Sequence, residues 1–197
     1  MKNAHEPTYI FVILTLILII IDTTLAWLST LFLSSGQSGV SWLYIAVAFM
    51  ILFTLWFGAY GAIAAYVGTL VGSGLLLSGA LANHPEVAVY WAIAGLLQVL
   101  IPLFVLRTLN VDLCLENIRD VNLLVVFGVL INNVIGAAWG AWTLGLGNII
   151  TPDKIGSVFT TWLIGNIIVT ILIVPLALRH LTPKIQKSRV YVKNYWD

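Results

Sequence analysis

The segment FGVLINNVIGAAWGAWT, residues 127–143, places two consecutive amides and two closely spaced glycines in an apolar run long enough to cross a bilayer. On an α-helix one face of this segment would carry Asn132, Gly136, Trp139, Gly140 and Thr143. An amide without a partner in hydrocarbon costs several kcal/mol, whereas glycines four residues apart let a second helix approach closely. We therefore predict that this face lines the interior of a helix bundle.

The composition predicts an all-α integral membrane protein. Of the 197 residues, 60% are apolar and only 9% are charged, against roughly a quarter in a soluble domain. No charged residue lies between Asp22 and Glu86 or between Asp120 and Asp153. The net charge of +1 gives no reason to expect nucleic acid as a partner.

Windows of about twenty apolar residues predict six transmembrane helices in one membrane domain, residues 9–178. They are expected near residues 9–32, 41–57, 59–81, 86–106, 121–144 and 157–178. Residues 1–8 precede this domain, and a basic tail, residues 179–197, follows it. Because only Gly58 and its neighbours separate the second and third helices, this pair is either a tight helical hairpin or one region broken by a re-entrant turn.

The distribution of lysine and arginine predicts that both termini are cytoplasmic. Only Lys154 would then lie outside, and the inner segments would hold Lys2, Arg107, Arg119, Arg179, Lys184, Lys187, Arg189 and Lys193. The expected location is the plasma membrane. Membrane lipid headgroups or a soluble partner are the expected contacts of six of these residues: Arg107, Arg119, Lys184, Lys187, Arg189 and Lys193.

Nine polar or indole side chains would fall in the middle or outer half of the membrane. They are Asp22, Trp91, Gln98, Asn132, Asn133, Trp139, Trp142, Trp162 and Asn166. Aromatic walls with a few polar groups are typical of a pocket for a small molecule. The alternative is an aromatic belt at the membrane surface together with structural hydrogen bonds between helices. The sequence leaves both interpretations open.

Two pairs of glycines predict close helix packing, namely Gly68 with Gly72 and Gly136 with Gly140. The packing could lie within one chain or between two copies. Catalysis is not expected, since the sequence contains no phosphate-binding glycine loop, zinc-binding His pair or nucleophile elbow. The single cysteine, Cys114, excludes a cysteine-cluster metal site, so no cofactor or metal is expected.

The sixth predicted helix reads W-L-I-G-N from Trp162 and continues through apolar residues to Pro175–Leu176. This stretch resembles the closing motif of the first type of membrane-associated sensor domain, the multi-helix input module of bacterial histidine kinases and diguanylate cyclases. The end of the fourth helix at Leu106–Arg107, the loop L-x-x-I-R-D-V at Leu115–Val121 and the glycine-containing fifth helix are similar as well. The resemblance covers residues 42–178.

The resemblance implies a sensor that recognises a small ligand, with two departures from the family. Asn166 stands where the family usually has an acid, and no kinase, cyclase or phosphodiesterase domain follows Arg179 in this sequence. A stand-alone copy is expected to signal through a separate protein.

The chain is also similar in length and helix number to the substrate-binding components of energy-coupling-factor vitamin transporters, which rely on a separate energising protein. Its first helix lacks the alanine repeat that many of them use to bind that protein. A structural assembly factor without a ligand is the third alternative.

Overall fold

The computed structural model describes residues 9–37, 40–76 and 80–192, and these are almost entirely helical, as predicted. The elements in order are α1 (Tyr9–Phe32), β1 (Ser34–Gln37), β2 (Val40–Ser41), α2 (Ala46–Phe57), α3 (Ala59–Gly68), the π-helix η1 (Thr69–Leu75), α4 (Ala80–Asn83), α5 (Pro85–Trp91), α6 (Ile93–Thr108), α7 (Ile118–Leu123), the π-helix η2 (Leu124–Ile131), α8 (Asn132–Leu146), the short 3₁₀ turn η3 (Pro152–Lys154) and α9 (Ile155–Ile185).

Within the described ranges, four helical segments are long and apolar enough to cross a membrane. They are Tyr9–Phe32, Pro85–Thr108, Ile118–Leu146 and Pro152–Ile185. The first three lie close to the helices predicted at residues 9–32, 86–106 and 121–144. The second of them contains a break near Ala92, between α5 and α6. The last continues past residue 178, so the first residues predicted as tail are helical.

The second predicted helix is shorter than expected. It begins at Ala46 rather than at residue 41, because Val40–Ser41 pairs with Ser34–Gln37 in an antiparallel hairpin. Its 12 residues extend about 18 Å at 1.5 Å per residue, less than the roughly 30 Å hydrocarbon core of a bilayer. The third is helical from Ala59 to Leu75, and residues 77–79 of its predicted range lie outside the described residues.

The structure shows this pair as two separate helices that pack against each other and are joined by a tight turn. Gly58 turns the chain between α2 and α3 with φ of 60° and ψ of −127°, a conformation that favours glycine. A Cβ atom on Gly61 would overlap the backbone of Phe53 and Thr54, so the two helices are in direct backbone contact.

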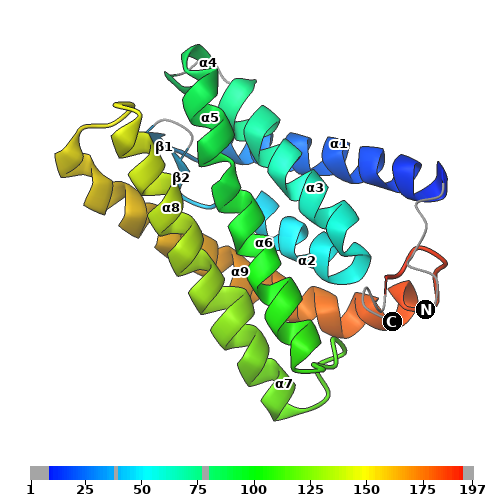
Figure 1. Cartoon of the computed structure of the whole chain (residues 1–197). Coiled ribbons are helices and arrows are strands. Elements are labelled where there is room, and N and C mark those ends of the chain that lie inside the picture. The colour runs from blue at the N-terminus through cyan, green and yellow to red at the C-terminus, as the bar shows by residue number, and fades with distance from the viewer. Residues whose placement is uncertain (1–8, 38–39, 77–79, 193–197) are drawn as a thin grey trace.

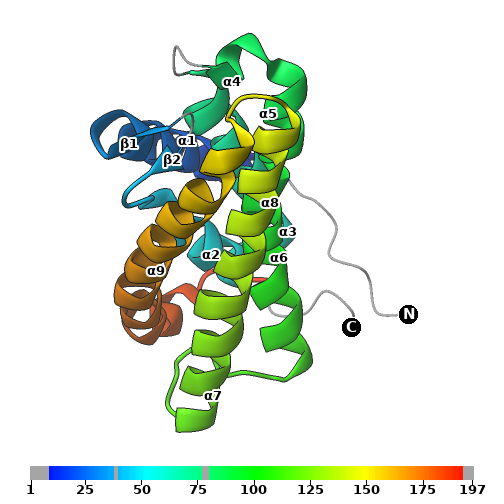
Figure 2. The same cartoon turned by 90° about the vertical axis from the view of Figure 1, so that its left-hand side faces the viewer.

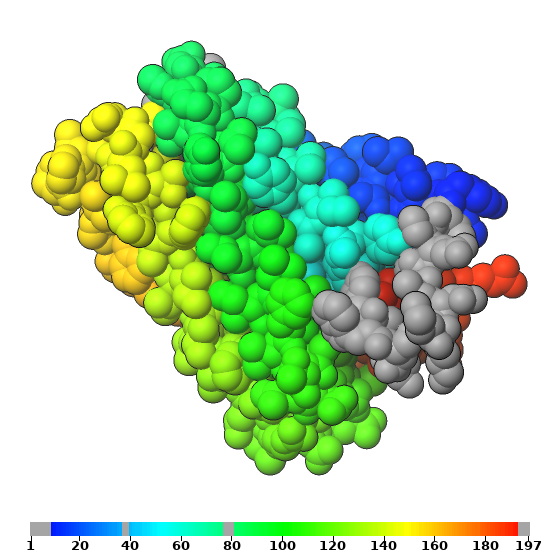
Figure 3. Space-filling view, in the orientation of Figure 1, coloured from blue at the N-terminus to red at the C-terminus, as the bar shows by residue number. Residues whose placement is uncertain are grey.

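Helix α2 forms the centre of the bundle. Ten of its twelve residues are buried, and it packs against α3, α6 and α9. Helices α6 and α8 run side by side in opposite directions, with α9 crossing behind them (Figures 1 and 2). In the space-filling view α5–α6 (green) lies between α8 (yellow-green) and α3 (cyan), as Figure 3 shows. The first helix, α1, is peripheral and packs along α3 and η1.

The two ends of the bundle carry different segments. The start of α1, the turn between α2 and α3 and the end of α9 gather at one end, whereas the hairpin β1–β2, α4 and η3 lie at the other (Figure 1). We call the first the basic end, because α6 ends with Arg107 in its last turn and the last part of α9 carries Arg179 and Lys184.

At the basic end the chain beyond α9 is fastened to α2. The guanidinium of Arg107 donates hydrogen bonds to the carbonyl oxygens of Leu55 (3.2 Å) and Val192 (2.5 Å). The Val192 amide donates to the carbonyl of Trp56 (3.0 Å), and the Trp56 indole donates to Thr182 Oγ1 (3.0 Å). These hydrogen bonds satisfy carbonyl groups in the last turn of α2, which lack a backbone N–H partner within that helix.

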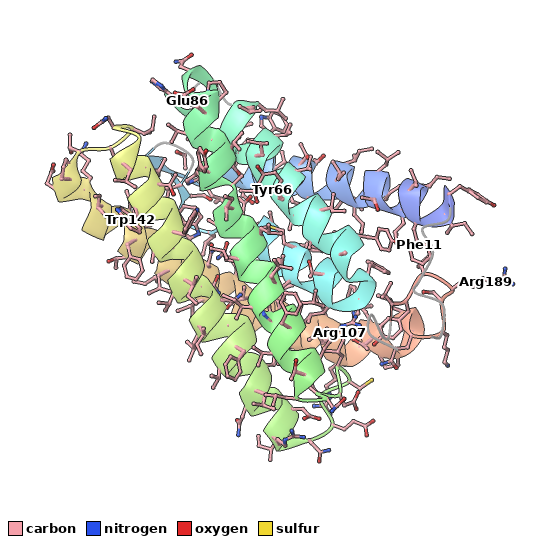
Figure 4. All side chains as sticks on the ribbon, in the orientation of Figure 1. Phe11, Tyr66, Glu86, Arg107, Trp142 and Arg189 are labelled. Carbon is pink, nitrogen blue, oxygen red and sulfur yellow. The ribbon has the colours of Figure 1, made fainter. Side chains whose placement is uncertain are left out.

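The residues predicted to contact lipid or a partner are therefore in different situations. Arg107 is half-buried and bonded to backbone, so it is a structural residue, in contrast to the exposed Arg189 (Figure 4). Arg119 is exposed and donates to the carbonyl of Leu109. Lys184 and Lys187 are exposed as well. Lys193 lies outside the described residues.

Candidate functional site

A buried amide cluster joins α6, α8 and α9. Gln98 Nε2 donates to Asn133 Oδ1 at 2.7 Å, and Asn133 Nδ2 lies 3.1 Å from Thr170 Oγ1. Asn132 Nδ2 donates to the backbone carbonyl of Gln98 at 3.1 Å. All four side chains are almost fully buried. Most of the amide groups in the cluster are thus hydrogen-bonded, as is expected for polar groups buried inside a helix bundle.

Two glycines of α8 create the space for this cluster. A Cβ on Gly136 would overlap the side chain of Gln98, and a Cβ on Gly140 would overlap the indole of Trp162. The predicted inner face of α8 is therefore occupied by side chains of α6 and α9. The other predicted pair, Gly68 and Gly72, receives the backbone of α1.

Two buried tryptophans meet beside the cluster. The ring centroids of Trp91, at the end of α5, and Trp162, on α9, are 5.6 Å apart with an interplanar angle of 57°. Both side chains are buried, and neither indole N–H has a hydrogen-bonding partner among the described residues. Leaving a buried N–H unpaired costs about 1–3 kcal/mol. The pair is thus an apolar wall with two unused donors.

A small cavity of about 10 Å³ lies against these indoles. Its lining comes from six parts of the fold: Val40, Ser41, Tyr44, Thr69, Trp91, Gln98, Trp162 and Asn166. A cavity of this volume holds about one water molecule. The side-chain nitrogen of Asn166 is a third buried donor without a partner, and the hydroxyl of Ser41 is also unpaired. The lining therefore offers several unused hydrogen-bond donors to one small space.

Four of the nine predicted residues line this cavity, namely Trp91, Gln98, Trp162 and Asn166. Asn132 and Asn133 lie next to it through their bonds to Gln98. The structure does not bring in the two tryptophans of α8. Trp139 is half-buried and donates to the carbonyl of Tyr90, and Trp142 is 59% exposed on the surface of α8 (Figure 4).

Asp22 is also separate from the cavity lining. It is buried in the interface between α1 and α3–η1, where its Cβ would lie 2.6 Å from a Cβ on Gly68. A chain of hydroxyls lies further along this interface, where Thr30 is about two turns beyond Asp22 on α1. Ser73 Oγ is 3.2 Å from the Tyr44 hydroxyl and 3.1 Å from Thr30 Oγ1.

Sequence reasoning missed Ser41, Tyr44 and Thr69 as site residues. The sequence predicts Ser41 and Tyr44 inside a regular second helix, but the hairpin and the irregular residues after it carry them into the bundle. The carbonyl oxygen of Trp42 presses directly against Gly165 of α9, which fixes this path. A period of 3.6 residues cannot reveal such a turn, although the polar run SSGQSG at residues 34–39 is a signal that a turn is present.

A second, larger groove of about 380 Å³ lies between α3 and α6. It is lined by Ala59, Ala62, Ile63, Tyr66, Leu96, Leu100, Leu103 and Phe104. The Tyr66 hydroxyl, which is its polar group, already donates to the carbonyl of Val89 at 3.2 Å. The groove therefore has the chemistry of a surface for acyl chains and offers no group that would select a polar ligand.

In the part of the chain that the structure describes, no three His, Cys, Asp or Glu side chains gather where they could hold a metal ion. Compared with known protein families, curated proteins and solved structures, the chain matches none.

Proposed function

We propose that this chain is a multi-span membrane receptor that binds a small ligand at the cavity between Trp91, Trp162 and Asn166. The observation that carries the proposal is the set of three unpaired buried N–H donors around one space. A ligand that accepts these bonds recovers a cost of about 1–3 kcal/mol per donor. The gain is specific, because these three donors have no hydrogen-bonding partner among the described residues.

The donors define the chemistry of the ligand. Nitrogen donors from two indoles and one amide match an acceptor oxygen, such as that of a carboxylate or carbonyl group. The cavity holds one group of about the size of water, so we propose that the ligand inserts one acceptor group there. The faces of the two indoles suit an apolar or unsaturated skeleton attached to that group.

Sensing through a separate partner protein is the mode of action that we favour. Helix α2 supports it, because the segment just before α2 supplies Tyr44 to the cavity and the last turn of α2 is bonded to Val192 beyond α9. A rigid, buried helix of this kind can carry a displacement from the cavity to the basic end. Transport with an energising partner is the second candidate, supported by the same cavity.

The test is mass spectrometry of small molecules released from gently purified protein. We expect a compound with a carboxylate or carbonyl group to co-purify with the wild type. Asn166→Leu and Trp162→Phe should each reduce its occupancy at least about tenfold, because each removes one hydrogen bond worth about 1.5 kcal/mol. Trp142→Phe is the matched control and should retain the compound, since Trp142 is exposed on α8. Lipid alone in every sample would contradict the proposal and favour a structural protein.

Uptake separates the two modes of action. Cells that carry an energising module and this chain should bind the released compound without accumulating it if the protein is a sensor. Accumulation of labelled compound that is lost in Asn166→Leu would instead establish transport.

We further propose that both chain ends lie in the cytoplasm, so that the basic end faces inward. The loop between α6 and α7 contains Cys114, the single cysteine of the sequence. A membrane-impermeant maleimide should leave Cys114 unlabelled in intact cells and label it after permeabilisation. Burial raises the pKa of the Cys114 thiol above its ordinary value, so labelling should accelerate as the pH is raised.

The matched control places a cysteine at the opposite end. Thr151→Cys in a Cys114→Ser background lies in the exposed segment before η3 and should react in intact cells. The reverse pattern of labelling would overturn the proposed orientation.

A further inference from the structure

The carboxyl group of Asp22 is an unusual feature of the α1 interface. The side chain is only 1% exposed, and both of its oxygen atoms lack a hydrogen-bonding partner among the described residues. It lies near the middle of a 24-residue apolar helix. An ionisable side chain within a membrane helix is costly and is therefore a candidate functional group by default.

The interface leaves no room for hydration of this group. Glycine stands opposite it, and a Cβ on Gly68 would lie 2.6 Å from Asp22 Cβ and 3.0 Å from its carbonyl carbon. One turn further, a Cβ on Gly72 would overlap the carbonyl oxygen of Thr23. Water cannot enter such a contact without separating α1 from α3–η1, so an ionised carboxylate there would be neither hydrated nor paired.

No opposite charge faces Asp22 from the elements packed against α1. Among the described residues, the elements with the main contacts to α1 are α3, η1, α2 and the strands β1 and β2, and none of these contains Asp, Glu, Lys, Arg or His. Their titratable groups, and the one just before α2, are tyrosines. Tyr60 stacks on Phe11, Tyr66 is bonded to Val89, and Tyr44 is bonded to Ser73.

We infer that Asp22 is a proton-binding site that holds its proton while α1 is packed against α3–η1. Loss of the proton creates a charge that this interface cannot accommodate, so ionisation and separation of α1 occur together. The ligand of the site is the proton itself. The inference does not depend on the proposed ligand cavity.

The position of Asp22 connects this site to the rest of the bundle. Ala26 lies one turn along the same face of α1, and its carbonyl is bonded to both Thr30 Oγ1 (2.9 Å) and Ser73 Oγ (3.4 Å). Ser73 is in turn bonded to Tyr44, which lines the cavity. Separation of α1 removes this set of bonds from beside Tyr44, so the protonation state of Asp22 reaches the cavity wall.

Infrared difference spectroscopy of the purified full chain tests the inference directly. At neutral pH we expect the wild type to show a protonated carboxyl stretching band that is absent from Asp22→Asn. Asp153→Asn, which removes an exposed carboxyl group of η3, is the matched control and should keep the band. The band should disappear as the pH is raised into the alkaline range. Its absence from the wild type at neutral pH would overturn the inference.

A second measurement covers the linkage to packing. Because a packed Asp22 retains a proton that it would lose once α1 separates, the thermal stability of the wild type should fall relative to Asp22→Asn as the pH rises. Asn is similar in size and neutral, so this variant should fold and lack this pH dependence. Wild-type stability that instead rises with sodium concentration and loses this dependence in Asp22→Asn would show a bound cation and overturn the proton site. Whether Asp22→Asn retains the co-purifying compound at neutral pH tests the proposed ligand cavity separately from the proton site.

Discussion

Replacing Gly165 by alanine is expected to destabilise the protein more than any other single methyl group added to α9. The new Cβ would overlap the carbonyl oxygen of Trp42 and lie 3.0 Å from its carbonyl carbon. These are backbone atoms of the segment that leads from β2 into α2, so no side-chain rotation relieves the overlap. Overpacking of this kind costs about 1–3 kcal/mol, and we expect the upper end of that range.

The displaced segment also carries Ser41 and Tyr44, which line the cavity. Gly165→Ala should therefore weaken retention of the co-purifying compound as well as lower the temperature of unfolding in detergent. Gly156→Ala is the matched control on the same helix, because a Cβ there meets nothing within 4 Å. Alanine is favoured over glycine in a helix by up to about 1 kcal/mol, so this control should be neutral or stabilising. Equal melting temperatures for the two variants would show that α9 does not pack on Trp42.

Replacing Asn133 by leucine is expected to have the second large effect. Asn133 accepts from Gln98, and it donates to the carbonyl of Val129 and contacts Thr170. The substitution leaves the buried Gln98 amide without its 2.7 Å partner, at a cost of about 1–3 kcal/mol. Interhelical hydrogen bonds in membranes average only about 0.6 kcal/mol, because separated helices find other partners. The near-complete burial of both amides leads us to expect about 2 kcal/mol.

A double-mutant cycle measures this interaction. Gln98→Leu with Asn133→Leu should cost less than the sum of the single changes, since removing both partners leaves fewer unpaired groups. Val134→Leu, on the exposed side of α8, is the control and should leave the free energy of unfolding nearly unchanged. Additive effects of the two leucine substitutions would show that the amides are not coupled.

The two cavities differ in size and in the state of their polar groups. The groove on α3 and α6 is far larger, but its polar group is already bonded. The small cavity has unpaired donors and connects residues from distant parts of the sequence. Selective recognition depends on unpaired hydrogen-bonding groups, so the small cavity is the better candidate despite its size.

Several features of the fold could be predicted because they depend on one helix at a time. The apolar runs near residues 9–32 and 121–144 correspond to α1 and to α7–η2–α8, since about twenty apolar residues in a row suit a helix in hydrocarbon. The inner face of α8 could be predicted from Asn132, Gly136 and Gly140, all of which are buried. Amide and glycine residues on one face indicate a packed surface whatever the partner helix is.

The positions of single aromatic and cationic residues could not be predicted in the same way. Trp142 and Trp162 are both indoles in apolar helices, yet one is exposed and the other meets Trp91. Arg107 ends its helix as expected, but it bonds to Leu55 and Val192 from distant parts of the chain. A helical period gives the face of a residue and not the neighbour that covers it.

The sequence by itself determined the helical class, the presence of helices apolar enough to cross a membrane, most helix positions and the polar inner face of α8. Each follows from local composition and the 3.6-residue period, which act before any helix meets another. The tertiary structure decided that Asp22 lies apart from the amide cluster, that Ser41 and Tyr44 enter the cavity, and that Val192 closes the end of α2. These features depend on backbone contacts at Gly68, Gly165 and Leu55, where the spacing between packed elements, rather than the pattern along one element, sets the outcome.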